Sequence, residues 1–253
     1  MILKGRKVSG GKAEGYALGI KDRISFLGDV DPSTGILNKD GSKITDKILV
    51  FPGGRGSTVG SYVIYQLKKN GTGPLAMVNQ LSETIVATGA IISDIPLVDG
   101  IDIDVISSGD QLIVDGDKGT IEIKNVKSKP VVTVFLRKNN EILMLKRSEE
   151  VGSYRGKWSA VSGYLEDAEP SKQAHTELLE ETGLRGKLVN QGGLIRVRYA
   201  DVIWEIHPFL MDLDSDRDIE LNWENTEYMW IPPEKIKELN TVPKLWEVYK
   251  TIE

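Results

Sequence analysis

The 253-residue sequence predicts an α/β (α+β) protein built from two domains, residues 1–126 and 127–253. Composition changes abruptly between the halves: 19 of the 26 glycines precede residue 120, whereas all five tryptophans and both histidines follow residue 150. Short β-rich runs alternate with turn signals and helical periodicity in both halves. A short, polar, lysine-rich segment, residues 124–130, separates them and is typical of a domain join.

Charge and cysteine content restrict the function classes. The net charge is −5 and the pI is about 5.3, which argues against a nucleic-acid partner. The chain has no cysteine, so it cannot hold a disulfide, a thiolate zinc site or its own Fe–S cluster. Its first residues carry no apolar leader and no run could span a bilayer, so we expect a cytoplasmic protein without a membrane partner.

The first half is expected to mix short strands with one or two helices. A Gly/Asp turn at 115–119 predicts a hairpin between its last two strands. Apolar residues at helical spacing predict a helix over 57–69, ended by Asn70-Gly71, and a shorter helix near 87–89. The expected strands are 14–20, 47–51, 101–106, 111–114 and 120–123.

The turn FPGGRGST, residues 51–58, follows an expected strand and opens the expected helix. Glycines such as Gly54 and Gly56 let the backbone approach a ligand, and free N–H groups at a helix start favour an anion. Arg55 could then clamp a phosphate or carboxylate. Alternatively, Ser57 simply caps the helix and Arg55 lies on the surface. No lysine follows the last glycine, so the turn is not a Walker A loop.

Three separated segments of the first half carry a family resemblance. GGRGST (53–58), SFLGDVDP (25–32) and NQLSET (79–84) together resemble the swivel domain of the aconitase X family, the small-subunit type of phosphomevalonate dehydratase. The resemblance implies a β/α swivelling domain that docks on a large subunit bearing the Fe–S cluster. It further implies that Ser57 is the catalytic base, with Arg55 and the flanking Gly54 and Gly56 beside the anionic groups of the substrate.

The second half is expected to mix strands with helices on both sides. Asn139-Asn140 marks a turn between its first two strands, and Ala200-Asp201 marks a hairpin. Proline precedes each of three expected helices, 171–182, 234–239 and 244–252. The expected strands are 131–137, 141–146, 158–161, 188–199, 202–212 and 228–231.

The stretch from Ser162 to Leu184 gathers carboxylates on one helix. Pro170 suits a first helical position and Gly183 suits the residue after a helix end. Glu180 and Glu181 lie three and four residues after Glu177, so all three crowd one edge of that helix. Hard oxygen ligands that converge in this way suit Mg²⁺ or Mn²⁺.

The same stretch resembles the Nudix box, in which G-x5-E precedes REUxEExGU and U is a bulky aliphatic residue. The separation of Gly163 from Glu169 is that of the family, and so is the spacing within the run from Glu177 to Leu184. Two positions depart from it: the gap after Glu169 is one residue short, and Thr176 stands where the family has an arginine that orients a box glutamate. The resemblance covers the whole second half and implies an α/β/α sandwich.

The Nudix resemblance also implies Mg²⁺- or Mn²⁺-dependent hydrolysis of a diphosphate. Glu177, Glu180 and Glu181, with the backbone carbonyl of Gly163, would hold the metal. One glutamate would take a proton from the attacking water, and we assign this role to Glu177. Glu169 either binds the metal indirectly or caps the helix.

Two neighbouring features outside the box leave alternatives open. Arg147 and Arg155 flank the loop before the box and either pair with substrate phosphates or are merely exposed. In the loop 223–227, an acidic residue either reaches the metal or lies in solvent.

Three functions follow from these observations. The preferred one is a Nudix pyrophosphohydrolase acting on a small-molecule diphosphate, fused to a swivel domain. The alternative is the small subunit of an aconitase X type hydro-lyase that needs a separate Fe–S large subunit. In the third, the Nudix half binds a ligand without cleaving it. The pairing of the two families also suggests isoprenoid phosphates as substrates, an inference by association.

Overall fold

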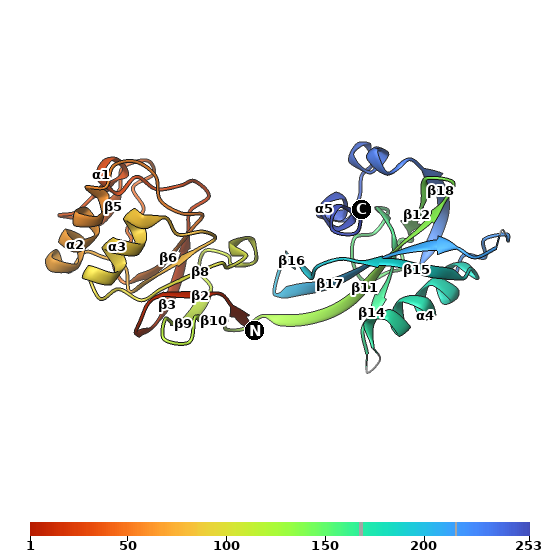
Figure 1. Cartoon of the computed structure of the whole chain (residues 1–253), viewed down its shortest axis with the longest axis horizontal. Coiled ribbons are helices and arrows are strands. Elements are labelled where there is room, and N and C mark those ends of the chain that lie inside the picture. Colours follow the sequence, from red (N-terminus) through yellow and green to blue (C-terminus); the bar gives the residue numbers. More distant parts are fainter. Residues whose placement is uncertain (167–168, 216) are drawn as a thin grey trace. The chain divides into compact units, whose positions relative to one another are not determined.

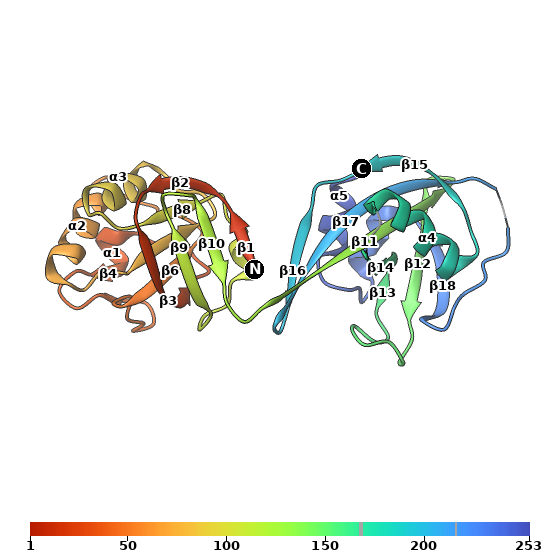
Figure 2. The ribbon, with the colours of Figure 1, turned by 90° about the horizontal axis from the view of Figure 1, so that it is seen from below.

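The computed structural model describes residues 1–166, 169–215 and 217–253, so the box residue Asp167 lies outside the described part. The chain divides into two compact units, Met1–Lys127 and Ser128–Glu253. Figures 1 and 2 show that each unit has its own sheet and its own helices. Within the described part, no helix is long and apolar enough to cross a membrane.

The first unit is built on an eight-stranded mixed sheet in the order β1-β10-β9-β3-β6-β7-β8-β2. Its centre is parallel, because β3 pairs with β6, β6 with β7, and β7 with β8 in the same direction. The strands are β1 (Ile2–Lys4), β2 (Arg6–Ser9), β3 (Lys12–Gly19), β6 (Lys47–Phe51), β7 (Ala76–Asn79), β8 (Leu97–Asp99), β9 (Gln111–Asp115) and β10 (Thr120–Ile123), with a separate ribbon of β4 (Val30–Asp31) and β5 (Ile36–Leu37).

Three helices pack on this sheet: α1 (Phe26–Asp29), α2 (Gly60–Asn70) and α3 (Thr84–Ile92). Phe26 of α1, Ile64 of α2 and Val86 of α3 join strand residues such as Phe51 in one buried apolar cluster. Helix α2 ends at Gly71, whose φ of +68° places it in the left-handed region that favours glycine. Because all three helices are anchored in this core, the core also sets where the loops that precede them end.

The expected hairpin, the strand 47–51 and the two helices of the first half are present. Two details were wrong. The run 101–106 is not a strand: Ile103–Val105 form a short 3₁₀ turn, because the Asp102 side chain accepts the N–H of Asp104. The nearest strand is β8, which ends at Asp99, two residues before the expected start. Helix α2 begins at Gly60, not at Ser57.

The second unit holds another eight-stranded sheet, in the order β13-β12-β11-β17-β15, with β14 on β11, β16 on β17 and β18 on β12. Its strands are β11 (Lys127–Lys138), β12 (Glu141–Arg147), β13 (Trp158–Ser159), β14 (Val161–Tyr164), β15 (Gly186–Gln191), β16 (Ile195–Tyr199), β17 (Val202–Leu213) and β18 (Asn225–Ile231). Its helices are α4 (Pro170–Thr182), the 3₁₀ helix η2 (Pro233–Glu238) and α5 (Leu245–Lys250).

Alternation along β11 separates two cores. Val134 and Leu136 pack with Leu178 of α4, whereas Phe135 between them packs with Tyr249 of α5. Successive side chains of a strand point to opposite faces, so α4 and α5 cover opposite faces of the sheet. The expected mixed α/β architecture with an α/β/α sandwich in the second half is confirmed.

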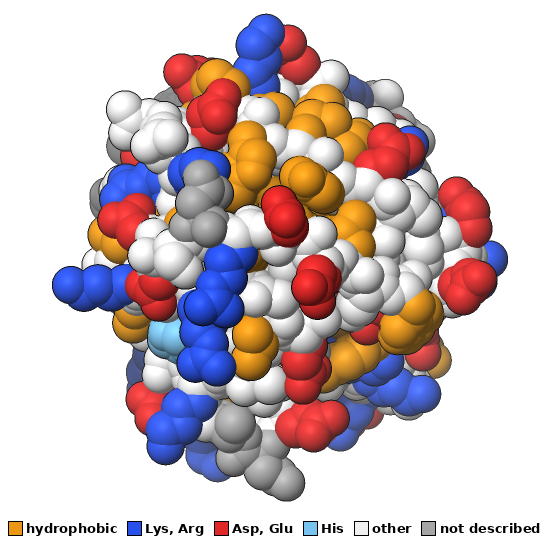
Figure 3. Space-filling view, turned by 90° about the vertical axis from the view of Figure 1, so that its right-hand side faces the viewer, with side chains coloured by type: hydrophobic (Ala, Val, Ile, Leu, Met, Phe, Trp, Pro, Cys, Tyr) orange, Lys and Arg blue, Asp and Glu red, His pale blue; other side chains and the backbone are white. Residues whose placement is uncertain are grey.

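Two elements of the second unit differ from expectation. The run 188–199 is not one strand, because Gly192 and Gly193 interrupt it and leave β15 and β16, each paired with β17. The helix expected at 234–239 is the 3₁₀ helix η2. Figure 3 shows one face of the molecule, on which acidic and basic side chains are mixed and hydrophobic side chains gather between them.

Candidate active site

Helix α4 carries the box glutamates along one side of a cavity. Pro170 is its first residue, and Gly183 follows its last turn with a φ of +70°. Ala174 and Leu178 bury one face against the sheet, which leaves Glu177 and Glu180 beside the strand β14. The amphipathic pattern of the helix thus fixes which carboxylates reach the cavity.

Gly163 on β14 makes room for Glu177. A Cβ at position 163 would lie only 1.8 to 2.1 Å from the carboxyl atoms of Glu177, so only glycine allows this approach. Gln173, one turn earlier on α4, donates a hydrogen bond of 2.7 Å to Glu177. Gln173 therefore orients a box glutamate, the role that the family resemblance gives to an arginine at position 176. Thr176 instead donates to the carbonyl of Lys172.

Glu181, the residue of α4 after Glu180, is buried and 4% exposed. Its two carboxylate oxygens accept the N–H of Ser162 at 2.8 Å and the side-chain amide of Asn225 at 2.7 Å. Burial raises the pKa of Glu181 to about 8 despite these two hydrogen bonds, and Glu224 and Glu177 raise it further. Glu181 thus links α4, β14 and the start of β18.

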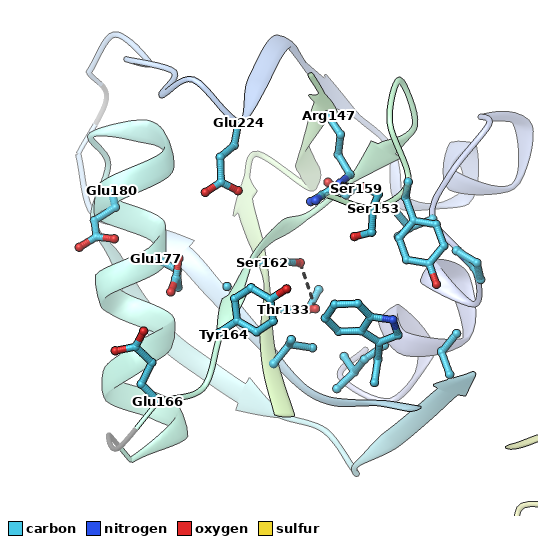
Figure 4. A pocket seen from close by; sticks show the side chains of 18 residues that line it. Thr133, Arg147, Ser153, Ser159, Ser162, Tyr164, Glu166, Glu177, Glu180 and Glu224 are labelled. Carbon is cyan, nitrogen blue, oxygen red and sulfur yellow. Dashed lines mark hydrogen bonds between the residues drawn. The ribbon is translucent and has the colours of Figure 1, made fainter. Parts of the chain in front are cut away.

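A cavity of about 290 Å³ lies between α4 and the strands β11, β14, β16 and β17. Four carboxylates line one part of it: Glu166, Glu177, Glu180 and Glu224 (Figure 4). Figure 4 shows Arg147 across the cavity from Glu177. Ser162 and Thr133, joined by a hydrogen bond of 3.1 Å, lie between these two sides.

The four carboxylates bring negative charge to the same end of the cavity. In the described part of the chain, none of them forms an ion pair. Burial raises the pKa of Glu177, and the charges of Glu180, Glu224 and Glu166 raise it further, although the bond from Gln173 opposes them. No three Asp, Glu, His or Cys side chains among the described residues already stand close enough together to hold a metal ion. An uncompensated set of hard oxygen donors nevertheless fits a divalent cation chemically.

The other expected site residues of the second unit fall in different places. Arg147 lines the cavity and donates from Nε to the carbonyl of Ser153 at 3.1 Å. Arg155 is exposed and donates to the carbonyl of Val151. Glu169 is the N-cap residue of α4 by position, but its side chain makes no capping bond.

In the acidic loop 223–227, the fold gives the two glutamates different places. Glu224 lines the cavity, whereas Glu227 pairs with Lys146 at 2.7 Å. The same loop supplies Asn225, which sequence reasoning missed. Asn225 is 6% exposed. No spacing within the loop distinguishes these roles, because they depend on how β18 pairs with β12.

In the first unit, the three segments that carry the family resemblance come together. The N–H of Arg55 donates to the carbonyl of Ile24, which joins the glycine turn to the segment before α1. A Cβ on Gly54 would lie 2.0 Å from a carboxylate oxygen of Glu83, in the segment before α3. Gly56 has a φ of +99°, and a Cβ there would meet Ser25. These glycines therefore let loops pack closely.

Arg55 and Ser57 are both exposed. Arg55 donates to the Asp29 carboxylate at 2.8 Å and to the carbonyl of Arg23 at 3.1 Å, at the edge of an open cavity of about 840 Å³. The expectation that Ser57 is the helix N-cap was wrong. Its Oγ accepts the N–H of Val59 at 3.3 Å in a turn before α2, and Val59 occupies the N-cap position.

Two family profiles match the chain, one for each unit. The aconitase X swivel domain matches residues 2–123, and the NUDIX domain matches residues 127–252. The first half is similar to the phosphomevalonate dehydratase small subunit of Thermococcus sibiricus, with 55% identity, covering 49% of this chain and 99% of the relative.

Solved structures give matches to each half. A crystal structure of Thermococcus kodakaraensis aconitase X in its holo form is 55% identical over 49% of this chain and 98% of that chain, with a TM-score of 0.48. The MutT protein of Methanosarcina mazei is 24% identical over 49% of this chain and 92% of that chain, with a TM-score of 0.43. The chain thus belongs to the aconitase X swivel family through its first half, and its second half carries a NUDIX domain.

Proposed function

We propose that the second unit hydrolyses a diphosphate linkage in a small molecule with the help of Mg²⁺ or Mn²⁺. The observation that carries this proposal is the cluster of unpaired carboxylates at one end of the cavity, beside Gly163 and opposite Arg147. Substrate phosphates would add negative charge to a site that already repels it. A divalent cation is therefore the component that this arrangement requires.

The residues that would hold the cation are Glu177, Glu180 and Glu181, together with the carbonyl oxygen of Gly163, and Glu224 lies on the same cavity. When bound, the cation supplies charge that offsets the phosphate oxygens and polarises a water molecule. For Glu181 to take part, one of its carboxylate oxygens would exchange its bond from Ser162 or Asn225.

Glu177 is the proposed general base. Its carboxylate is half-buried, burial raises its pKa above the ordinary value, and Gln173 holds its orientation. Arg147, on the opposite side of the cavity, would bind a phosphate oxygen through its guanidinium group.

The test is release of phosphate or nucleotide by the purified chain with Mg²⁺ or Mn²⁺. The panel holds nucleoside triphosphates, dinucleoside polyphosphates, ADP-ribose, NADH and isoprenoid diphosphates, the last because relatives of the first half are phosphomevalonate dehydratase subunits. We expect turnover that a chelator removes and that the double change Glu180→Gln and Glu181→Gln abolishes. The control Glu227→Gln alters a carboxylate that pairs with Lys146 outside the cavity.

The outcomes separate the hydrolase from a sensor. Ligand-induced stabilisation of the chain without any turnover would favour a binding module. An unchanged rate in the double variant would remove the glutamates from the mechanism.

The first unit supports a second candidate function, separate from diphosphate hydrolysis. We propose that it also acts as the small subunit of a hydro-lyase, with Ser57 as the base and with Arg55, Gly54 and Gly56 near the substrate. The convergence of the three loops and the 55% identity to a phosphomevalonate dehydratase small subunit support this proposal. Because the chain has no cysteine, an Fe–S cluster would come from a large subunit.

The subunit proposal is tested by co-expression with a cysteine-bearing large subunit of the aconitase X family. We expect a stable complex that dehydrates phosphomevalonate. Ser57→Ala should remove that activity, whereas Ser107→Ala, at another exposed serine of the same unit, should keep it. Failure to form a complex would count against the proposal.

A further inference from the structure

Strand β18 contains a bulge where it reaches the candidate active site. Along most of β18 each residue pairs with one residue of β12, and Glu227 lies opposite Lys146. The next pair is Arg147 with Asn225, so Thr226 is an extra residue on β18. A bulge of this kind changes the face of the sheet to which the following side chains point.

The bulge places Asn225 on the face of the sheet that α4 covers. In the regular part of β18, Trp230 packs against the core beneath α4, whereas Met229 packs against the core beneath α5. Residues an even number of positions apart on a regular strand share a face. Without the bulge, Asn225 would therefore point to the same face as Met229, away from α4. Opposite Arg147 instead, its side chain reaches α4.

The side chain of Asn225 joins this strand to α4. Its Nδ2 donates a hydrogen bond of 2.7 Å to Oε2 of Glu181, and the two residues are 6% and 4% exposed. The other carboxyl oxygen of Glu181 accepts the N–H of Ser162 on β14. A hydrogen bond shielded from water is stronger than the same bond in solvent. Glu181 is therefore a fixed point of α4 to which Asn225 is attached.

The residue before Asn225 is Glu224, which lines the cavity. Three further hydrogen bonds act on this short segment. The carbonyl of Glu224 accepts the N–H of Ser148 at 2.7 Å, its N–H donates to Oδ1 of Asn222 at 3.1 Å, and the N–H of Asn225 donates to the carbonyl of Asn222 at 3.3 Å. In the view of Figure 4, Glu224 lies between α4 and Arg147. The backbone of Glu224 is thus held on both sides.

We propose that Asn225 is a positioning residue, which holds the Glu224 carboxylate at the cavity for a divalent cation by anchoring its loop on Glu181. This inference rests on the cation-dependent hydrolysis proposed above. Residues that orient a metal ligand contribute to metal affinity without touching the metal. Without the anchor, Glu224 would turn toward solvent, to which the preceding Trp223 is already 64% exposed. The bulge at Thr226 is therefore part of the site.

The test is the affinity of the full chain for Mn²⁺, measured by isothermal titration calorimetry without substrate. Asn225→Ala removes the anchor and leaves the carboxylates of the cavity in place. The matched control is Asn190→Ala, which removes an asparagine bond of 3.0 Å to the carbonyl of Ile252 outside the cavity. Thermal melting of the metal-free variants shows whether each one is folded.

A double-mutant cycle identifies the carboxylate through which Asn225 acts. We expect Asn225→Ala to weaken Mn²⁺ binding by about tenfold, the lower end of the effect of residues that orient metal ligands. The loss should be absent when Glu224→Gln is already present. It should remain when the background is Glu227→Gln, because Glu227 pairs with Lys146 outside the cavity. A general disturbance of the fold would lower the affinity in both backgrounds.

Asn222→Ala tests the same loop with a milder change. It removes the oxygen that accepts the N–H of Glu224, at a residue that is only partly buried. We expect a smaller loss of Mn²⁺ affinity than in Asn225→Ala, again absent in the Glu224→Gln background. If Asn225→Ala does not fold, Asn222→Ala decides the question.

An Mn²⁺ affinity that is unchanged in both loop variants, or a loss that persists in the Glu224→Gln background, would overturn the assignment. The proposed hydrolysis can fail separately. The expected cycle without turnover of any diphosphate would reject hydrolysis and keep the positioning role. Turnover with an Mn²⁺ affinity that Asn225→Ala leaves unchanged would keep hydrolysis and reject the positioning role. No Mn²⁺ binding by the wild type would also reject the positioning role.

Discussion

The two units use a close approach at glycine for opposite purposes. In the first, Gly54 admits the Glu83 carboxylate, which already accepts the N–H of Val86 at the start of α3. In the second, Gly163 admits the Glu177 carboxylate, which lies on a cavity among other carboxylates. The first contact lets two loops pack together, whereas the second places a carboxylate on the candidate active site.

The charges of the two units differ in the same way. In the first unit, Arg55 pairs with Asp29, and the buried carboxylate of Asp99 receives two hydrogen bonds from Arg6. In the second, the carboxylates of the cavity have no cation partner in the described part of the chain. Like charges held together cost free energy until a ligand offsets them. The comparison teaches that uncompensated charge marks the candidate centre better than a glycine-rich turn does.

The largest expected effect comes from Gly163→Ala. Its Cβ would displace the Glu177 carboxylate, which lies at the free end of a flexible side chain and can move without disturbing the core. We expect the melting temperature to change little and hydrolysis to fall by about 100-fold, since small misplacements of reacting groups have effects of that size. Steady-state kinetics and thermal melting measure the two quantities.

Gly152→Ala is the matched control, because a Cβ there meets nothing within 4 Å. It should retain wild-type activity. Full activity in Gly163→Ala would show that the position of Glu177 does not matter and would undo the contrast between the two glycines.

The next effect concerns the compensated charges of the first unit. Asp99→Ala removes both bonds from Arg6 and leaves the partly buried N–H of Ser82 without its acceptor. We expect the first unit to lose about 2 kcal/mol of unfolding free energy. Differential scanning calorimetry should show a lower melting transition for that unit.

Asp117→Ala is the comparison for Asp99→Ala. Its ion pair with Lys7 is 3.5 Å long and both side chains are more than half exposed. Such pairs contribute less than about 1 kcal/mol. Equal losses in the two variants would mean that burial does not distinguish them.

The change per pH unit that Glu181 sets is smaller. Burial raises its pKa from 4.5 to about 8, so the folded chain holds a proton that the unfolded chain releases between these values. The unfolding free energy should therefore fall as pH rises through this window, by at most about 1.4 kcal/mol per pH unit. Urea titrations with a chelator present measure it. Glu181→Gln should flatten the slope, and Glu227→Gln should leave it in place.

The sequence predicted the elements whose signals are local. Pro170 and Gly183 bracket α4 as expected, and the two asparagines 139 and 140 form the turn between β11 and β12 with positive φ angles. Spacing along α4 also brought Glu177 and Glu180 to one cavity. Each of these features depends on residues within a few positions of one another.

Features that depend on tertiary contacts were not predictable. Glu181 was expected beside its two neighbours on the helix edge, but its side chain turns inward to Asn225, 44 residues away. The start of α2 was placed three residues too early, because Ser57 satisfies a local turn before the helix begins. The fold was also needed to show that Gln173 orients Glu177 and that Trp204 lines the cavity.

The smallest effect on stability tests the first unit directly. Asp29→Asn removes the charge that holds Arg55 but keeps an oxygen that can accept the N–H of Ser25. Because this pair is partly exposed, the unfolding free energy should change by less than about 1 kcal/mol. The released guanidinium should bind inorganic phosphate more tightly, and calorimetric titration at low salt measures the difference. Asp40→Asn is the control, because it removes the same charge from the same cavity without touching Arg55. If both variants gain affinity equally, the gain reflects net charge alone, and Arg55 loses its proposed role beside the substrate.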